Sequence, residues 1–194
     1  MTNIAIRQAT FTPLGAMLVP IAIGLFVPGY SVLSQQMSEL EMYATLPNVA
    51  TRVAAIVSGL SIALFGMGLL LRYPRESRFT MLAAVIFGVS MIGNGVFTMG
   101  SPWHGLYGIG LFDMLVPAFF AAEIAAPRGL KSLTTASMAV SVVCLVYNWS
   151  MIVHLDPPGL QGLTQRIFSV IAFGWYSLAS LAISQVDDRV VMRH

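Results

Sequence analysis

Six long apolar stretches, separated by short polar breaks, restrict what this chain can fold into. Of its 194 residues, 57% are hydrophobic and only 9% are charged, whereas soluble globular domains carry about 25% charged residues. A transmembrane helix needs about 20 mostly apolar residues. Six such helices use most of the chain and leave no room for a separate soluble domain. We therefore predict an all-α integral membrane protein, folded as a six-helix transmembrane bundle.

The predicted helices form a single membrane domain over residues 1–194. Their approximate bounds are 13–30, 51–71, 79–99, 104–126, 133–153 and 166–183. Residues 184–194 are expected to form a polar cytoplasmic tail. The apolar first stretch is followed by Pro28 rather than by a cleavage site, so it is interpreted as a retained helix and not as a signal peptide.

A short additional helix is predicted between the first two spans. Leu33, Met37, Leu40 and Ala44 recur there at helical spacing, and the S-x-x-E pattern that starts at Ser38 is typical of a capping box. The segment is amphipathic. It is expected to lie at the outer membrane interface or to dip back toward the bundle.

The basic residues indicate the orientation of the bundle. One side of the membrane receives Arg7, Arg72, Arg75, Arg78, Arg128, Lys131, Arg189 and Arg193, whereas the other receives only Arg52 and Arg166. Cytoplasmic loops carry an excess of Lys and Arg. Both termini are therefore predicted to be cytoplasmic, which requires an even number of spans and agrees with six.

Asp113 is the clearest candidate for a functional group inside the membrane. It lies nine residues past His104, about 13 Å deeper along an α-helix that rises about 1.5 Å per residue. Ionisable residues at this depth are expensive and mark functional sites by default. Asn94 and Asn148 are deep amides that either tie helices together or bind a ligand. Glu123, near the cytoplasmic end, is expected to form an interfacial ion pair with a nearby arginine.

A second set of polar residues gathers at the predicted outer ends of the spans. Its members that are candidates for binding a ligand are Tyr30, Ser34, Glu39, His104 and Arg166, with Asp113 and Asn94 below them. One interpretation is an outward-opening pocket. The other is a set of ion pairs that fasten the outer loops, in which Arg52 and Arg166 pair with Glu39, Glu41 or Asp156.

Two kinds of chemistry were considered for this set. His104, His154 and Asp156 are residue types that bind zinc, but no HExxH or comparable spacing is present, so they remain candidates and no metal or other cofactor is predicted. Ser34 or Ser38, with His104 and Glu39, would provide the groups of a serine hydrolase. No G-x-S-x-G motif accompanies them. His104 or His154 would be the general base of an enzyme that acts on lipids.

Other partner classes are limited by composition. The basic residues lie at helix ends and form no stripe with interleaved aromatics, so no nucleic-acid partner is predicted. Membrane lipids are expected partners, and a second copy of the chain or another membrane protein is a further candidate. Cys144 is the only cysteine and is expected to be a buried apolar residue.

Three segments resemble an uncharacterised prokaryotic six-helix membrane family, domain of unknown function 998. GYSVLSQQMSELE is similar to the family's YSPLSQ-x-ISELG stretch, GVFTMGSPWHG to its G-x-F-P-x-D-P…HG region, and GLTQRIFSVIAFGW to its G-L-x-x-R-I…W region. The positions that match are Tyr30, Ser34, Ser38, Glu39, His104 and Arg166. Met99 and Gly100 stand where the family often has an Asp. The resemblance implies six helices, a prokaryotic inner membrane and a role for the outer cluster, and names no activity.

Three functional hypotheses follow. The first is a membrane protein that binds a small molecule, ion or lipid in an outward-opening polar pocket, for transport or sensing. The second is an intramembrane hydrolase or transferase that acts on lipids. The third is a structural subunit of a membrane complex, in which the polar residues only hold loops.

Overall fold

The computed structural model describes residues 2–104 and 106–191, and within these residues all regular structure is helical. The elements are α1 (Thr2–Arg7), η1 (Gln8–Thr10), α2 (Thr12–Gly24), η2 (Met37–Met42), α3 (Thr45–Arg72), α4 (Arg78–Val96), η3 (Leu106–Met114), α5 (Leu115–Phe120), η4 (Ala121–Ala125), α6 (Lys131–Ile152) and α7 (Gln161–Val191). Six segments in the described part of the chain are long and apolar enough to cross a membrane. The chain is therefore an all-helical integral membrane protein.

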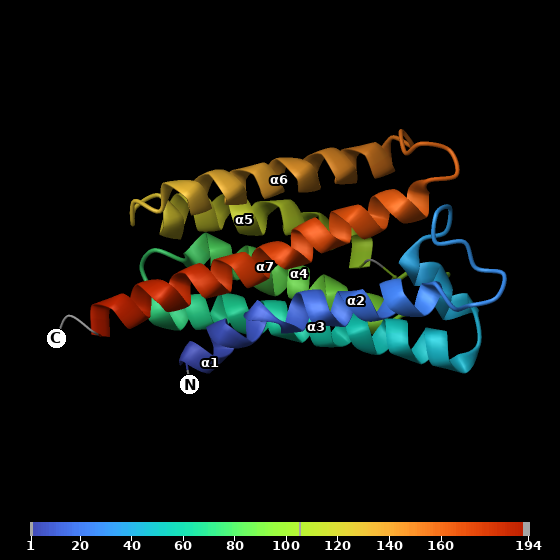
Figure 1. The fold of residues 1–194 in the computed structure, drawn as a ribbon, viewed down its shortest axis with the longest axis horizontal. Coiled ribbons are helices and arrows are strands. Elements are labelled where there is room, and N and C mark those ends of the chain that lie inside the picture. Colours follow the sequence, from blue (N-terminus) through green and yellow to red (C-terminus); the bar gives the residue numbers. More distant parts are fainter. Residues whose placement is uncertain (1, 105, 192–194) are drawn as a thin grey trace.

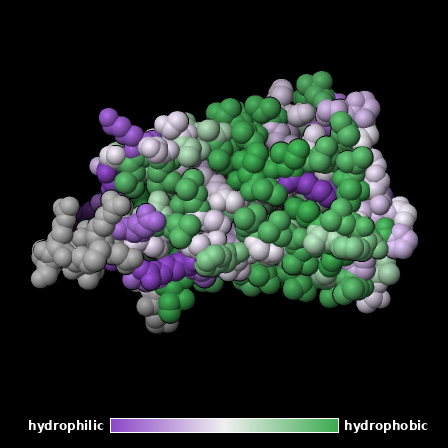
Figure 2. Space-filling model, in the orientation of Figure 1, coloured by the Kyte–Doolittle hydropathy of each residue, from purple (hydrophilic) through white to green (hydrophobic). Residues whose placement is uncertain are grey.

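The spans form a closed ring that follows the order of the chain. Each span packs against the one before it, and α7 closes the ring by contacting both α6 and the first span, α1–α2 (Figure 1). The side chains that face outward are largely apolar, as expected for contact with lipid. On the face shown in Figure 2, hydrophobic residues cover most of the middle of the bundle, and hydrophilic ones gather toward the end where the C-terminus lies.

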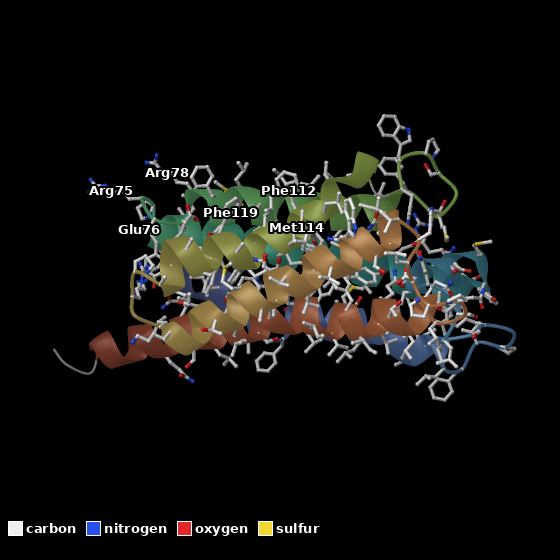
Figure 3. The ribbon with its side chains drawn as sticks, turned by 90° about the horizontal axis from the view of Figure 1, so that it is seen from above. Arg75, Glu76, Arg78, Phe112, Met114 and Phe119 are labelled. Atoms are coloured by element: carbon white, nitrogen blue, oxygen red, sulfur yellow. The ribbon has the colours of Figure 1, made fainter. Side chains whose placement is uncertain are left out.

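The two ends of the bundle differ in character. One end, called here the loop end, carries the long connection of residues 25–44 and the turn between α6 and α7. The other, called the basic end, carries both ends of the described chain and the tight turns that follow α3 and η4. Figure 3 shows Arg75 and Arg78 extending away from the bundle at the basic end.

The closest helix pair is α3 with α4, and glycines allow their backbones to touch. A Cβ atom on Gly88 would lie 2.6 Å from the carbonyl oxygen of Gly59, and one on Gly59 would collide with the carbonyl oxygen of Gly88. Gly95 meets the backbone of Arg52 in the same way, and Gly66 meets Ala84. Small residues at a helix interface are the usual means of close packing in membranes.

Several helix bounds differ from those expected from the sequence. The first span begins at Thr2 rather than near residue 13, because α1 and η1 pack Ile6 and Ala9 into the core against α3 and α7. The second begins at Thr45. The last begins at Gln161 and continues to Val191. Most of the expected tail is therefore helical, and residues 192–194 lie outside the described residues.

The fourth span is not the plain α-helix expected over residues 104–126. It passes from the 3₁₀ helix η3 through one and a half turns of α-helix, α5, to a π-helical turn, η4. Pro117 has no backbone N–H to donate to the carbonyl of Asp113, and Gly108 has a φ of +81°. Irregular backbone at membrane depth is tolerated where it is enclosed by protein or lines a cavity.

Glu123, for which an ion pair with an arginine was expected, closes the basic end of α4 with hydrogen bonds. Its carboxylate accepts hydrogen bonds from the backbone N–H of Phe79, at 3.1 Å, and from the backbone N–H and hydroxyl of Thr80, at 2.8 and 2.6 Å. These N–H groups belong to the first turn of α4, where no intrahelical acceptor exists. Glu123 therefore caps one helix from another.

Replacing Glu123 with alanine should lower the free energy of unfolding by about 1–2 kcal/mol, the usual cost of losing a helix cap. Thermal unfolding of the purified protein in detergent measures this loss. Glu76→Ala is the matched control, because Glu76 is an exposed acid at the same end. Equal melting temperatures for the two variants would contradict the capping role.

Candidate functional site

A cavity of about 340 Å³ lies inside the ring, in the half nearer the loop end. Every span contributes to its wall, together with η2 and the residue that precedes it. The polar side chains that line it are Gln36, Ser38, Glu41, Thr51, Ser90, Asn94, His104, Asp113, Tyr147, Asn148, Gln165 and Ser169. Apolar side chains, among them Met17, Phe87 and Phe173, complete the wall. The volume is within the range of about 300–1,000 Å³ that small-molecule sites occupy.

Asp113 and Asn148 form a buried polar pair in the cavity wall. The Asn148 side-chain N–H donates to Asp113 Oδ1 at 2.7 Å, which joins η3 to α6. Asp113 is 6% exposed. Asp113 lies near the end of the 3₁₀ helix η3, not in the α-helix expected from the sequence. The pair therefore links the irregular fourth span to α6 at the cavity wall.

His104 lies at the loop end of the cavity, on the connection between α4 and η3. Its Nδ1 is 2.8 Å from the carbonyl oxygen of Phe97. Since a carbonyl only accepts, the neutral ring carries its proton on Nδ1 and keeps a lone pair on Nε2. His104 can thus accept a hydrogen bond from a ligand. The group that orients it is a backbone carbonyl, not the carboxylate of Glu39 expected for a hydrolase.

Two buried hydroxyls in the cavity wall have no hydrogen-bond partner within the described part of the chain. They belong to Ser90, which is 1% exposed, and to Thr51, which is 7% exposed. A buried polar group without a partner costs free energy, so most such groups in folded proteins are satisfied by protein or by an enclosed molecule. These two hydroxyls mark positions where a ligand could supply the missing partners.

The cavity does not continue to the basic end, because aromatic side chains fill that half of the ring. Trp175 packs edge to face against Phe65 and Phe120, with ring centroids 6.3 and 5.2 Å apart, and against Tyr176 at 4.9 Å. The Trp175 indole N–H donates to Ser137 at 2.9 Å. The site is therefore a pocket with a closed floor.

Residues 25–44, called here the strap, cover the loop end and are fastened by Arg166. The Arg166 guanidinium donates to the carbonyls of Val32 and Gln35, at 2.8 and 3.0 Å, to Gly162 in its own helix at 2.7 Å, and to the hydroxyl of Tyr30. Gly162 lets the strap approach, since a Cβ there would lie 2.7 Å from the Val32 carbonyl oxygen. Arg166 is thus a clamp on the strap.

Other predicted site residues also belong to the strap rather than to the cavity wall. Glu39 accepts from the backbone N–H of Gln36, at 2.8 Å, and so caps η2, where Ser38 had been expected to start the capping box. The Tyr30 hydroxyl donates to the Gln36 carbonyl at 2.9 Å, and burial raises the pKa of its phenol. Ser34 is exposed. These groups shape the strap and touch no cavity surface.

Three other charged groups at the loop end form hydrogen bonds with backbone or hydroxyl groups. Arg52 donates to the carbonyls of Gly95 and Val96, at 2.9 and 3.2 Å, where α4 ends. Glu41, which lines the cavity, accepts from the Met99 N–H at 2.8 Å. Asp156 accepts from the Thr164 hydroxyl at 3.3 Å. Ion pairs had been proposed for these residues, and the contacts that the described part of the structure shows for them are with backbone and hydroxyl groups.

His154 lies in the turn after α6, with a φ of +57°, and is exposed. Neither His154 nor Asp156 lines the cavity that His104 lines. Among the described residues, no three His, Cys, Asp or Glu side chains come together in a way that could hold a metal ion. The three candidate metal ligands are therefore not brought to one site.

The structure brings together four of the predicted residues, His104, Asp113, Asn94 and Ser38, and adds others that sequence reasoning did not assign to a site. A signal for some of these existed in the sequence. Ser90 and Asn94 are four residues apart in α4, and Gln165 and Ser169 are four apart in α7. Residues at that spacing share one helix face, so each pair marks a polar stripe within an apolar span.

No curated protein and no solved structure matches the chain. One family does match, over residues 11–182, which includes every residue of the cavity wall and of the strap, the middle four spans whole, and most of the first and last spans. The chain therefore belongs to the DUF998 family, described as proteins of unknown function.

Proposed function

We propose that this protein binds a small molecule in the cavity at the loop end, as the recognition step of transport or sensing. The observation that supports this most directly is the combination of a cavity of about 340 Å³ with two buried hydroxyls, those of Ser90 and Thr51, that lack partners within the described residues. A purely structural bundle would be expected to pair its buried polar groups internally. Here they face a space that a ligand can fill.

The same proposal includes an orientation. Arg72, Arg75, Arg78, Arg128 and Lys131 lie at or beside the turns of the basic end. Positive residues favour the cytoplasmic side, so the basic end and both termini are assigned to the cytoplasm of a prokaryotic cell. The strap then faces outward, and ligands reach the cavity from outside. The aromatic floor would have to rearrange for transport, whereas sensing requires only that occupancy be transmitted through the helices.

Access to the cavity can be measured with a single introduced thiol. In a Cys144→Ala background, which removes the only native cysteine, Ser90→Cys should react with the small neutral reagent methyl methanethiosulfonate in the native protein. Ser58→Cys is the matched control, since Ser58 is fully buried in α3 and does not line the cavity. We expect Ser90→Cys to react at least tenfold faster than Ser58→Cys. Equal, slow reaction at both positions would refute an accessible cavity.

A further inference from the structure

The cavity wall carries two acidic side chains. Glu41 and Asp113 are 7% and 6% exposed, and both line the cavity. Of the residues that the structure describes, no lysine or arginine contributes to the wall. His104 adds a ring nitrogen that accepts hydrogen bonds when the imidazole is neutral. The fixed charges of the cavity, where ionised, are therefore negative.

The nearest cations of the loop end are engaged elsewhere. Arg166 is bound to strap carbonyls and to Tyr30, and Arg52 is bound to the last carbonyls of α4. Neither side chain is part of the cavity wall. Burying an ionised carboxylate is costly unless it is paired with a positive charge or takes up a proton. Within the described residues, the chain supplies hydrogen bonds to Glu41 and Asp113 but no cation.

The shape of the cavity favours an organic cation over a bare metal ion. Its volume of about 340 Å³ far exceeds that of an ion, and the described acids and histidines form no cluster suited to a metal. Phe87, Phe168 and Phe173 contribute aromatic surface to the wall. Aromatic rings attract organic cations through cation–π contacts and also pack against apolar groups. Ser90 and Thr51 add hydroxyls that accept hydrogen bonds from an ammonium group.

We infer that the ligand of this cavity is a small organic cation, an amine or quaternary ammonium compound with an apolar body. Its positive group is recognised by the carboxylates of Asp113 and Glu41, and its apolar part packs against the phenylalanine rings. This inference rests on the proposed function, because it requires that the cavity be reached by small molecules. Beyond the proposed function, the inference states that the ligand is positively charged.

The experiment compares two thiol reagents of similar size and opposite charge in the Cys144→Ala background. One is 2-(trimethylammonium)ethyl methanethiosulfonate, and the other is 2-sulfonatoethyl methanethiosulfonate. Their rates are measured at Ser90→Cys and at Ser34→Cys, the latter an exposed site at the same end. The rate ratio at Ser34→Cys removes the intrinsic difference between the reagents. Clefts lined by one sign of charge raise the local concentration of counter-ions by about 10-fold or more.

We expect the cation-to-anion rate ratio to be at least about 10-fold higher at Ser90→Cys than at Ser34→Cys. Adding Glu41→Gln or Asp113→Asn to Ser90→Cys should lower this rate ratio. The comparison of Ser90→Cys with Ser34→Cys can be made without either variant. If the two ratios are equal while methyl methanethiosulfonate still reacts at Ser90→Cys, the charge inference fails and the proposed function stands. If the neutral reagent does not react either, both fail.

Discussion

Replacing Gly59 with alanine should lower the free energy of unfolding by about 2 kcal/mol or more, because the added methyl group has no space. Its Cβ would collide with the Gly88 carbonyl oxygen and would lie 2.9 Å from the Ile92 backbone nitrogen. Both obstacles are backbone atoms of α4, which cannot turn aside as a flexible side chain would. Overpacking of this kind typically costs about 1–3 kcal/mol. Helices α3 and α4 must separate to accommodate it.

Unfolding in mixed micelles of increasing denaturing detergent measures this effect. Gly174→Ala provides the matched control, since a Cβ at Gly174 in α7 meets nothing within 4 Å. Alanine favours helices over glycine by up to about 1 kcal/mol, so the control should be neutral or more stable. The close approach of α3 and α4 would be disproved if Gly59→Ala behaved like Gly174→Ala.

Replacing Arg166 with methionine should release the strap from α7. The substitution keeps an apolar stem but removes hydrogen bonds to the carbonyls of Val32 and Gln35 and to the Tyr30 hydroxyl. Hydrogen bonds to charged groups contribute about 1.5–3 kcal/mol, so the loss of the three should lower the local stability of the strap by at least about 3 kcal/mol. Hydrogen exchange in residues 25–44 should then accelerate about 100-fold where their exchange depends on local opening.

Hydrogen exchange followed by mass spectrometry distinguishes this release from general unfolding. Peptides from α3 and α4 should keep their protection, whereas strap peptides lose it. Arg75→Met is the control, because Arg75 is exposed at the basic end and its loss should leave the strap unchanged. Arg166→Lys should be intermediate, since one ammonium group cannot reproduce the fork of a guanidinium. Unchanged exchange in Arg166→Met would rule out the clamp.

The sequence predicts which segments span the membrane, because this depends on the length of the apolar runs. It predicts less well where each helix begins, because this depends on packing against other helices. The six spans follow from runs of apolar residues. The helical start at Thr2 could not be anticipated, because Gln8 and Thr10 look like the polar beginning of a loop. In the structure Gln8 donates to the Ser61 carbonyl at 2.9 Å, and Thr10 forms a hydrogen bond of 2.8 Å with Ser180. Tertiary partners therefore extend the helix.

Parts of the candidate site could also be predicted from the sequence, because polar residues stand out in apolar spans. Asp113 and His104 were predicted from their places in an apolar span and at its outer end, and both line the cavity. The role of Arg166 does not follow from position, since a cation among acids suggests ion pairs. In the folded protein, the Arg166 guanidinium instead donates hydrogen bonds to backbone carbonyls of the strap. The neighbours of a loop are set by its three-dimensional path, which spacing in the sequence does not specify.

The closed ring has a consequence for how the protein is made. Because each span packs against its predecessor, most contacts can form in the order in which helices leave the ribosome and enter the bilayer. The exception is α7, which must meet the first span across nearly the whole length of the chain. Until α7 arrives, the cavity lacks one wall, and the strap has no Arg166 to bind. Completion of the cavity wall and of the contacts that hold the strap therefore waits for the last span of the chain.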